Sequence, residues 1–235
     1  MQREVNRAIS GNGNYAEAQL CKSVDSFYNR CIKRAIDFSL ALIAFIILLP
    51  IYLIISLAIV IDSGFPVLYR ADRGGYKGPP FKICKFRSMV PNADRIGGYT
   101  TALHDPRITR IGRFLRRTKL DEIPQLINII RGEMSFVGPR PEVLTYVNMF
   151  EGLEKYILQV RPGITDYSSL KFADMDATVG DGDVDKYFVE NILAQKNALR
   201  VKYVAEMSLK TDVKIFFKTV FHVLGHFFSK RTKES

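Results

Sequence analysis

Two adjacent carboxylates, Asp121 and Glu122, directly follow a basic stretch of the chain, and residues of these types in this order suit chemistry at phosphorus. The cations of that stretch are Arg113, Arg116, Arg117 and Lys119. A carboxylate can attack phosphorus when magnesium and guanidinium groups neutralise the phosphate oxygens. Taken alone the acidic pair is a weak signal, because such pairs commonly decorate solvated helix faces.

The stretch from Ile111 to Arg131, which contains both carboxylates, has the spacing of a helix. Its apolar positions are Leu120, Ile123, Leu126, Ile127 and Ile130. Neighbours on a helix point about 100° apart, so one carboxylate could attack while the other holds a cation. Gln125, one turn after Asp121, could orient that carboxylate by a hydrogen bond or cap nearby backbone instead.

Further cations lie in loops marked by proline and glycine. Arg140 belongs to the loop 135–141, and Arg161 begins the loop 161–163. Forked guanidinium donors suit phosphate oxygens, so we expect both arginines to bind substrate, although structural ion pairs are an alternative. Lys85 and Arg87 are expected to meet a lipid phosphate or a nucleotide, or else simply to attract anionic headgroups.

An uncharged apolar run extends from Phe38 to Ile61. Its 24 residues exceed the ~20 needed to cross a hydrocarbon core. Pro50 near its middle removes a backbone donor, so we expect the helix to bend or break between Leu49 and Pro50. Cations crowd both flanks, at Arg30, Lys33 and Arg34 before it and at Arg70, Arg73, Lys77, Lys82, Lys85 and Arg87 after it.

Both flanks should therefore face the cytoplasm under the positive-inside rule. This favours a re-entrant helix hairpin that enters one leaflet and returns, provided that backbone groups freed near Pro50 find partners. The alternative is a single kinked transmembrane helix, because prolines also occur in spanning helices.

Three ordered motifs add specificity to the carboxylate pair. Residues 116–141 read RRTKLDEIPQLINIIRGEMSFVGPRP, with KFRSM upstream at 85–89 and RPGIT downstream at 161–165. With these motifs the chain resembles the bacterial sugar transferases, the monotopic phosphoglycosyl transferases. The resemblance runs from about Lys33 to the C-terminal helix. The short chain is similar to the small members of the family, which lack an additional N-terminal membrane bundle.

The resemblance implies a two-step reaction at the cytoplasmic face of the bacterial inner membrane, on a monotopic protein. Asp121 corresponds to a nucleophile that attacks the β-phosphate of a UDP-sugar and expels UMP. Polyprenyl phosphate, normally undecaprenyl phosphate, then takes the phosphosugar. Glu122 matches a residue that binds Mg²⁺, a cation that prefers one or two carboxylates plus phosphate oxygens. Arg116 matches an arginine near the phosphates. The sequence does not identify the sugar.

Two departures from the family pattern stand out. Many members carry Ser-Pro at the membrane break, where this chain has Leu49-Pro50. The backbone groups freed at Pro50 must therefore find hydrogen-bond partners other than that serine. The family's RPGITG-W becomes a segment ending in Asp166-Tyr167, which puts the substrate preference in question but leaves the nucleophile unchanged.

We therefore expect an α+β fold that is mainly helical. Residues 1–20 would be a flexible polar tail, 21–66 the re-entrant membrane helix hairpin, 67–211 the cytoplasmic catalytic domain and 212–235 an amphipathic interfacial helix. Strand-like alternation at 67–70 and 81–86, around a turn rich in glycine and proline, predicts a small β-hairpin.

The C-terminal segment from Asp212 to Lys230 is apolar and aromatic, with a cationic residue or a histidine at every fourth position of one stripe: Lys214, Lys218, His222 and His226. A helix in the membrane interface fits this composition, and docking on the protein's own core fits it equally. The apolar face also leaves room for a homo-oligomer. The histidine pair lacks the glutamate of a zinc motif, so we expect no metal there.

The formal net charge of +10 indicates anionic partners. We expect these to be nucleotide and lipid phosphates, with no nucleic acid. A membrane-anchored basic binding module would explain the charge and the apolar run, but not the carboxylates beside arginine turns. A conventional glycosyltransferase would use an Asp-x-Asp pair, found here only at Asp174–Asp176 and in the acidic loop Asp181–Asp185, neither of them in a βαβ pattern. That loop also lacks EF-hand spacing.

Overall fold

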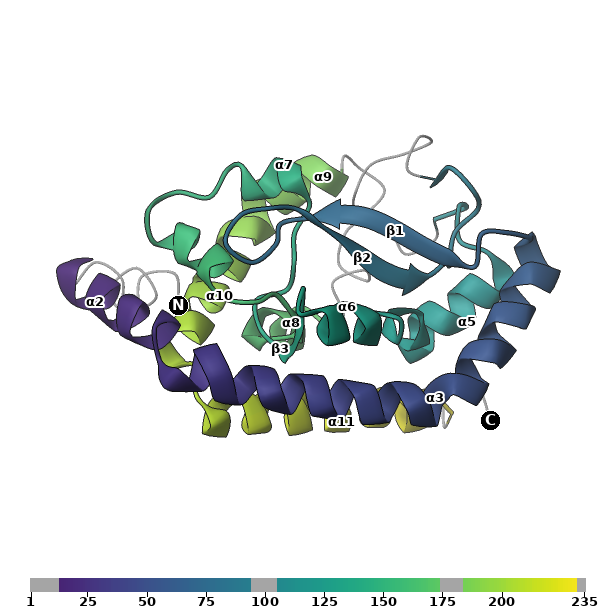
Figure 1. Ribbon diagram of the computed structural model, residues 1–235. Helices are drawn as coiled ribbons and strands as arrows, with labels where there is room; N and C mark the ends of the chain where they lie inside the picture. The colour runs from purple at the N-terminus through teal and green to yellow at the C-terminus, as the bar shows by residue number, and fades with distance from the viewer. Residues whose placement is uncertain (1–12, 94–104, 174–183, 232–235) are drawn as a thin grey trace.

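Helices dominate the computed structural model, which describes residues 13–93, 105–173 and 184–231 (Figure 1). The expected mainly helical α+β class is confirmed for these residues. The α-helices are α2 (Gly13–Val24), α3 (Lys33–Ser63), α5 (Arg110–Thr118), α6 (Gln125–Arg131), α7 (Leu144–Val147), α8 (Tyr167–Lys171), α9 (Val184–Tyr187), α10 (Ala194–Glu206) and α11 (Leu209–Arg231). Tighter or wider helical turns are η1 (Tyr28–Ile32), η2 (Leu120–Glu122), η3 (Gly152–Gln159) and η5 (Phe188–Leu193).

The predicted β-hairpin is confirmed. Strand β1 (Leu68–Arg73) pairs antiparallel with β2 (Phe81–Phe86), in a register that places Leu68 opposite Phe86. On β2, Ile83 and Phe86 are buried while Lys82 is exposed. Ile83 belongs to an apolar cluster with Leu126 and Ile129 of α6, and Phe86 belongs to another with Leu115 of α5, so the hairpin packs against both helices.

The apolar run forms one helix, α3, and not the two helices of the expected hairpin. The helix continues through Pro50, and Figure 1 shows it bending, so that its last part turns up from the base of the molecule. Proline removes one helical hydrogen bond, which accounts for a bend without a break. By length and composition, Tyr28–Ser63 could cross a membrane, and only 11% of its most apolar window is buried.

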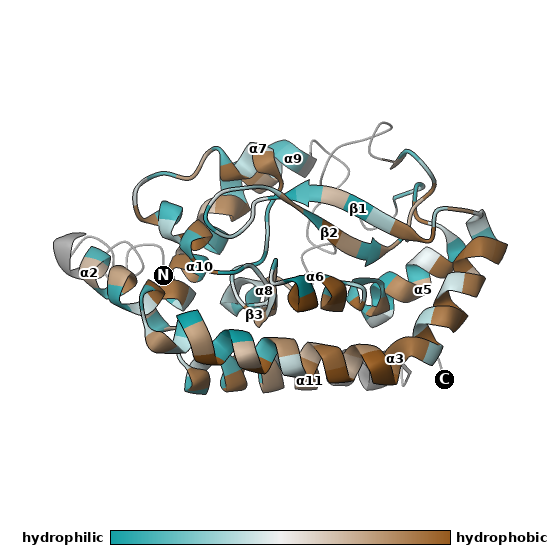
Figure 2. Ribbon diagram, viewed as in Figure 1, coloured by the Kyte–Doolittle hydropathy of each residue, from teal (hydrophilic) through white to brown (hydrophobic). Residues whose placement is uncertain are grey.

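The outer surface of α3 is almost wholly apolar (Figure 2). Its large exposed side chains are Phe38, Leu40, Leu42, Ile43, Ile46, Ile47, Leu49, Ile51, Leu53, Ile54, Leu57 and Ile61. So many adjacent apolar side chains exceed what a water-facing surface normally carries, and a continuous patch of this kind marks a contact with lipid or with another protein.

The C-terminal helix α11 has one buried side and one exposed apolar side. Ile215 is fully buried in the main core, whereas Phe217 and Phe221 are exposed by 54% and 70%. The helix thus docks on the protein and still presents an apolar aromatic face. Its contact with a membrane interface stays a prediction.

The N-terminal segment differs from the expected flexible tail of residues 1–20. From Gly13 onward the chain forms α2, and Leu20 is buried in the main core beside α10. Ser23 Oγ donates to the carbonyl of Ala205 at 2.9 Å. The polar composition hid this helix, because its burial depends on a partner helix almost two hundred residues later in the chain.

A buried ion pair joins the start of α3 to α11. Lys33 Nζ donates to Asp212, and both side chains are less than 10% exposed. The Asp212 carboxylate also accepts hydrogen bonds from the hydroxyls of Tyr28 at 2.6 Å and Tyr203 at 2.8 Å. With three donors, the charge of Asp212 is fully compensated away from water, which is the condition for a buried carboxylate to be tolerated.

Replacing Lys33 with methionine should destabilise the fold by about 3 kcal/mol, because it leaves a buried carboxylate without its cation. Denaturant unfolding of the protein in detergent micelles would measure this. The matched control is Arg30→Met, which removes the exposed Arg30–Asp25 pair on the same helical segment and should change stability little. Equal effects of the two variants would contradict the role given to the buried pair.

Candidate active site

The two carboxylates lie on a short turn between helices, not on the continuous helix expected from Ile111 to Arg131. Helix α5 ends at Thr118, and Lys119 then adopts a left-handed backbone conformation with φ of 58°. The turn η2 (Leu120–Glu122) follows, and Pro124 precedes α6. Proline cannot donate a backbone hydrogen bond inside a helix, which explains why the apolar periodicity spans two helices rather than one. We call η2 together with Ile123 the catalytic turn.

Glu122 is held between two cations. Lys85 Nζ donates to Glu122 Oε1 at 2.9 Å, and Arg140 donates from both terminal nitrogens, with Nη1 3.2 Å from Oε2 and Nη2 close to Oε1. Burial would raise the pKa of Glu122, but the charges of Arg140 and Lys85 outweigh burial and hold it well below its usual range. Glu122 is therefore ionised at every physiological pH.

Asp121 differs sharply from its neighbour. It is only 7% exposed, and its Oδ1 is buried with no hydrogen-bond partner among the described residues. Burial raises the pKa of Asp121, and the adjacent charge of Glu122 raises it further. The charges of Lys85, Arg116 and Lys119 oppose this rise without cancelling it. A desolvated carboxylate with an unused oxygen is a stronger nucleophile than a solvated or ion-paired one.

The loops of the GPRP and RPGIT motifs meet as a short parallel pair, β3 (Ser135–Val137) with β4 (Gly163–Thr165). Their backbones approach so closely that a Cβ on Gly163 would lie 2.1 Å from the nitrogen of Gly138. Only glycine fits such an approach. Arg140, at the end of this contact, donates from Nη1 to the carbonyl of Ile164 at 2.8 Å. The two motifs therefore aim one guanidinium at Glu122.

Asp166, one of the two departures from the family pattern, supports the same loop. Its buried carboxylate accepts from the backbone nitrogens of Ser169 at 2.6 Å and Arg140 at 3.3 Å, and it caps α8. Two serine hydroxyls, from Ser168 and Ser169, also donate to it. The aspartate at this position therefore helps to hold the backbone of Arg140 in place.

Arg87 lies at the end of α3 and not beside the carboxylates. Its guanidinium donates to the carbonyls of Ser63 at 2.9 Å, Gly64 at 2.6 Å and Phe65 at 2.9 Å. Those carbonyls belong to the last residue of α3 and to the two residues after it, where backbone acceptors lack intrahelical donors. Arg87 therefore caps the apolar helix, whereas Lys85, two residues earlier, reaches the site.

Arg161 lies at the far end of α6 from the carboxylates. Its Nε donates to the carbonyl of Gly132 at 3.1 Å, and its guanidinium stacks 4.8 Å from the ring of Tyr76. Arg34 caps the same helix end through the carbonyls of Ile129 and Ile130. Both arginines therefore make structural contacts at this helix end.

Gln125 and Arg116 flank the catalytic turn. Gln125 is completely buried, and neither end of its amide has a hydrogen-bond partner among the described residues. It therefore does not bond to Asp121 in this conformation, contrary to one of the two roles considered for it. Arg116 lies in the last turn of α5, where its charge lowers the pKa of Asp121.

Two residues that fix the elements around the site, Asn128 and Tyr52, were not predicted from the sequence. Asn128, fully buried, accepts from the backbone nitrogen of Cys84 at 2.9 Å and donates to the carbonyl of Lys82 at 2.9 Å, which fixes β2 against α6. Tyr52 on α3 donates to the carbonyl of Ile123 at 2.7 Å. Neither carries a sequence signal, because an amide in a helix and a tyrosine in an apolar run are common.

The carboxylates fit Mg²⁺ only in part. Glu122 Oε1 accepts two hydrogen bonds and Oε2 one, so one lone pair of Oε2 remains for a metal. One carboxylate oxygen plus phosphate oxygens and water would suit this cation. Within the described residues, no cluster of three or more metal-binding side chains exists. Lys85, Arg116, Lys119 and Arg140 surround the two carboxylates with positive charge, which repels a metal ion on its own. This surrounding therefore favours a metal that arrives bound to a phosphate.

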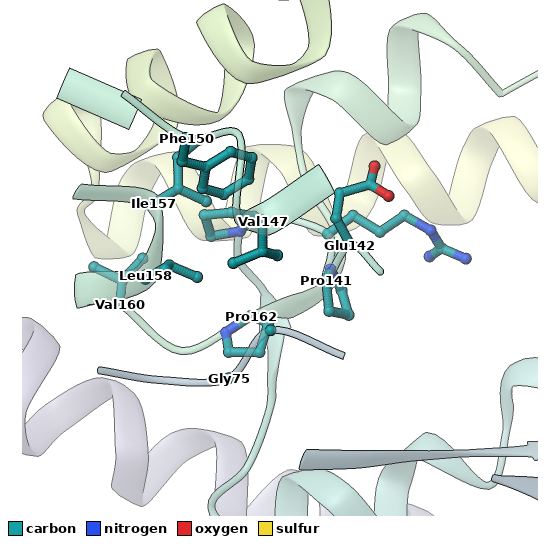
Figure 3. Close-up of a pocket in the computed structure, with 12 residues that line it drawn as sticks. Gly75, Pro141, Glu142, Val147, Phe150, Ile157, Leu158, Val160 and Pro162 are labelled. Atoms are coloured by element: carbon teal, nitrogen blue, oxygen red, sulfur yellow. The ribbon is translucent and has the colours of Figure 1, made fainter. Parts of the chain in front are cut away.

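A small cavity lies behind the Arg140 loop, and Figure 3 shows Val147, Phe150, Ile157 and Leu158 around it. Its volume of about 10 Å³ leaves room for about one water molecule. Ligand pockets are far larger, typically ~300–1,000 Å³. This cavity is therefore a packing gap under the hairpin loop, and a substrate must reach the carboxylates from another side.

Several candidates from the sequence lie outside the described residues. They are Asp174, Asp176, Asp181 and Asp183 of the acidic segments, and the side chain of His226. The expectations that the histidine pair binds no metal and that the acidic loop is no EF-hand therefore stay predictions.

Known proteins are similar to this chain over most of its length. The model of the bacterial sugar transferase family matches residues 28–226. The UDP-glucose:undecaprenyl-phosphate glucose-1-phosphate transferase of Escherichia coli (strain K12) is 39% identical over 197 residues, which cover 82% of this chain and 40% of that protein. The exopolysaccharide production protein ExoY of Sinorhizobium fredii is 36% identical over 80% of this chain and 83% of its own length.

A third relative matches almost the whole chain. The UDP-N-acetylgalactosamine-undecaprenyl-phosphate N-acetylgalactosaminephosphotransferase of Aeromonas hydrophila is 33% identical over 96% of this chain and 52% of its own length. The chain thus spans only about half of this relative and 40% of the Escherichia coli protein.

Replacing Asp121 with asparagine should stabilise the fold at neutral pH, because the variant removes an unpaired buried charge. The folded-state pKa of Asp121 lies above the ordinary 3.8, so its ionised form costs free energy once the pH exceeds that raised pKa. The gain in Tm should therefore be present at pH 7.5 and vanish as the pH falls towards 3.8.

Thermal unfolding in detergent across this pH range measures the effect. Asp72→Asn is the matched control, because Asp72 is about half exposed beside Lys82 and should show no comparable gain. A lower Tm for Asp121→Asn at pH 7.5 would mean that Asp121 makes favourable contacts that we have not recognised.

Proposed function

The chain belongs to the bacterial sugar transferase family, and on this premise we propose that it transfers a sugar 1-phosphate from a UDP-sugar to polyprenyl phosphate. Two relatives are named as transferases that act on undecaprenyl phosphate, one with UDP-glucose and one with UDP-N-acetylgalactosamine. The single observation that carries the mechanism is the contrast between the carboxylates: Glu122 is paired with two cations, whereas Oδ1 of Asp121 is buried without a partner among the described residues.

In the first step, an oxygen of Asp121 attacks the β-phosphorus of the UDP-sugar. A bond forms between that oxygen and phosphorus, and the bond from phosphorus to the bridging oxygen breaks, so UMP leaves with both electrons. The sugar phosphate is then attached to Asp121 as an acyl phosphate, a mixed anhydride. Desolvation favours attack because no hydrogen bond at Oδ1 must first be broken.

In the second step, an oxygen of polyprenyl phosphate attacks the same phosphorus. The bond from phosphorus to Asp121 breaks and the carboxylate is regenerated, which leaves a polyprenyl-diphosphate-linked sugar. Arg140, Lys85 and Arg116 surround the reacting group with positive charge, which stabilises the oxygens that gain negative charge in both steps.

We propose that Glu122 holds Mg²⁺ together with the diphosphate. When bound, Mg²⁺ neutralises phosphate oxygens and so makes the phosphorus easier to attack. Arg140 and Lys85 keep Glu122 ionised and oriented for this role, since their charges hold the pKa of its carboxyl well below the usual range.

For the apolar helix we propose a re-entrant, monotopic arrangement at the inner membrane, with the site facing the cytoplasm. Both ends of α3 bond to the same body of the protein. Lys33 pairs with Asp212 at its start, and Arg87 caps its end. A helix that crossed the bilayer would separate its ends by the whole hydrocarbon thickness of ~30 Å, whereas a bent helix can return both to one side.

The test of the function uses the full chain in phospholipid nanodiscs with a panel of UDP-sugars, Mg²⁺ and undecaprenyl phosphate. We expect release of UMP with at least one donor, and its loss when EDTA removes the metal. UDP release would indicate a conventional glycosyltransferase, and no release with any donor would favour a binding module.

Within this assay, the substitution Asp121→Asn should abolish UMP release, while the variant protein should remain bound to the membrane. Without acceptor lipid, mass spectrometry of the wild type should find a phosphosugar on the peptide that contains Asp121. Asp72→Asn is the matched control and should retain activity. Turnover by the Asp121 variant would refute its role as nucleophile.

The topology can be tested with cysteines. Cys21 and Cys31 are exposed on the N-terminal side of α3, and Arg70→Cys in a background without them marks the other side. An impermeant maleimide should label both positions in inside-out vesicles and neither in intact spheroplasts. Opposite labelling of the two sides would establish a spanning helix.

A further inference from the structure

Figure 1 shows α3 passing below α6 and turning up beside α5, the two helices on either side of the catalytic turn. Before Pro50, Ala41 and the side chains beside it pack against α6, which follows the turn. After Pro50, Ile55 and Ile59 pack with Leu115 of α5 and near Leu120, which precede the carboxylates. The two arms of one helix therefore hold the two elements on either side of the carboxylates.

Among the residues that the structure describes, one polar contact connects the bent helix directly to the catalytic turn. The hydroxyl of Tyr52 donates to the carbonyl of Ile123 at 2.7 Å, and Ile123 directly follows Glu122. The ring of Tyr52 is itself fixed, with Phe45 at a centroid distance of 5.3 Å and Phe86 at 5.4 Å. These two neighbours come from the other arm of α3 and from β2, so the hydroxyl has little freedom.

The turn has weak support from its own backbone. Its two internal hydrogen bonds, from Glu122 to Lys119 and from Ile123 to Leu120, are both 3.3 Å long. Pro124 cannot donate a third. The carbonyl of Ile123 accepts from the backbone nitrogen of Leu126 at 3.0 Å and from the Tyr52 hydroxyl at 2.7 Å, and the second of these hydrogen bonds ties the turn to α3.

We propose that Tyr52 is a positioning residue that couples the bent membrane helix to the nucleophile. It holds the backbone one residue beyond Glu122, so that the Asp121 carboxylate stays aligned with the phosphorus between the cations. This inference rests on the proposed function. It adds that the membrane-embedded segment sets the geometry of the reaction as well as anchoring the protein.

Tyr52→Phe tests the proposal, because it removes one hydroxyl and keeps the ring packing. In nanodiscs we expect kcat for UMP release to fall about three- to tenfold, in line with the loss of one hydrogen bond, while KM for the UDP-sugar stays unchanged. The matched control is Ser56→Ala, one turn later on α3. The Ser56 hydroxyl donates to the carbonyl of Tyr52 at 2.6 Å and has no hydrogen bond to the catalytic turn within the described part of the chain.

Hydrogen–deuterium exchange provides a readout that does not depend on catalysis. Peptides covering residues 119–126 should exchange faster in Tyr52→Phe than in the wild type or in Ser56→Ala, at equal global stability. Unchanged exchange and unchanged kcat in Tyr52→Phe would overturn the proposal. If the wild type released no UMP, the proposed function would fail, and faster exchange would still show that Tyr52 restrains the turn.

Discussion

The ion cluster of Glu122 with Lys85 and Arg140 is the interaction on which the candidate site depends. It brings β2, the catalytic turn and the β3–β4 loop to one point, although these segments are far apart in the chain. A carboxylate with two cations satisfies its charge away from water, and any one member alone would be costly to bury. The cluster thereby creates an electropositive surrounding in which a second carboxylate, Asp121, can be left unpaired.

Leaving Asp121 unpaired opposes stability and, in the proposed mechanism, leaves an oxygen free for attack on phosphorus. Burial and the charge of Glu122 raise its pKa, so its ionised form destabilises the folded state, while the same desolvation keeps Oδ1 available for attack. Functional sites often hold groups that a purely structural site would pair or neutralise. Here the surrounding cations limit the cost without removing the reactivity.

The apolar helix belongs to the same design. Its start is tied to α11 through Lys33 and Asp212, its end is capped by Arg87, and Tyr52 reaches the catalytic turn from a point just past Pro50. Packing on both sides of the bend means that the helix shapes the domain as well as presenting an apolar face. A bend caused by one proline lets a single segment contact both neighbours of the turn.

The sequence by itself determined the family, the β-hairpin, the apolar helix with its proline, and the carboxylates with Lys85 and Arg140 as candidates, because motif order and composition carry that information. Tertiary structure alone decided which cations meet Glu122. Arg87 and Arg161 have the same guanidinium as Arg140, yet their donors bond to carbonyls at helix ends. Local residue type cannot reveal such partners, since hydrogen bonding and burial depend on which distant segments pack together.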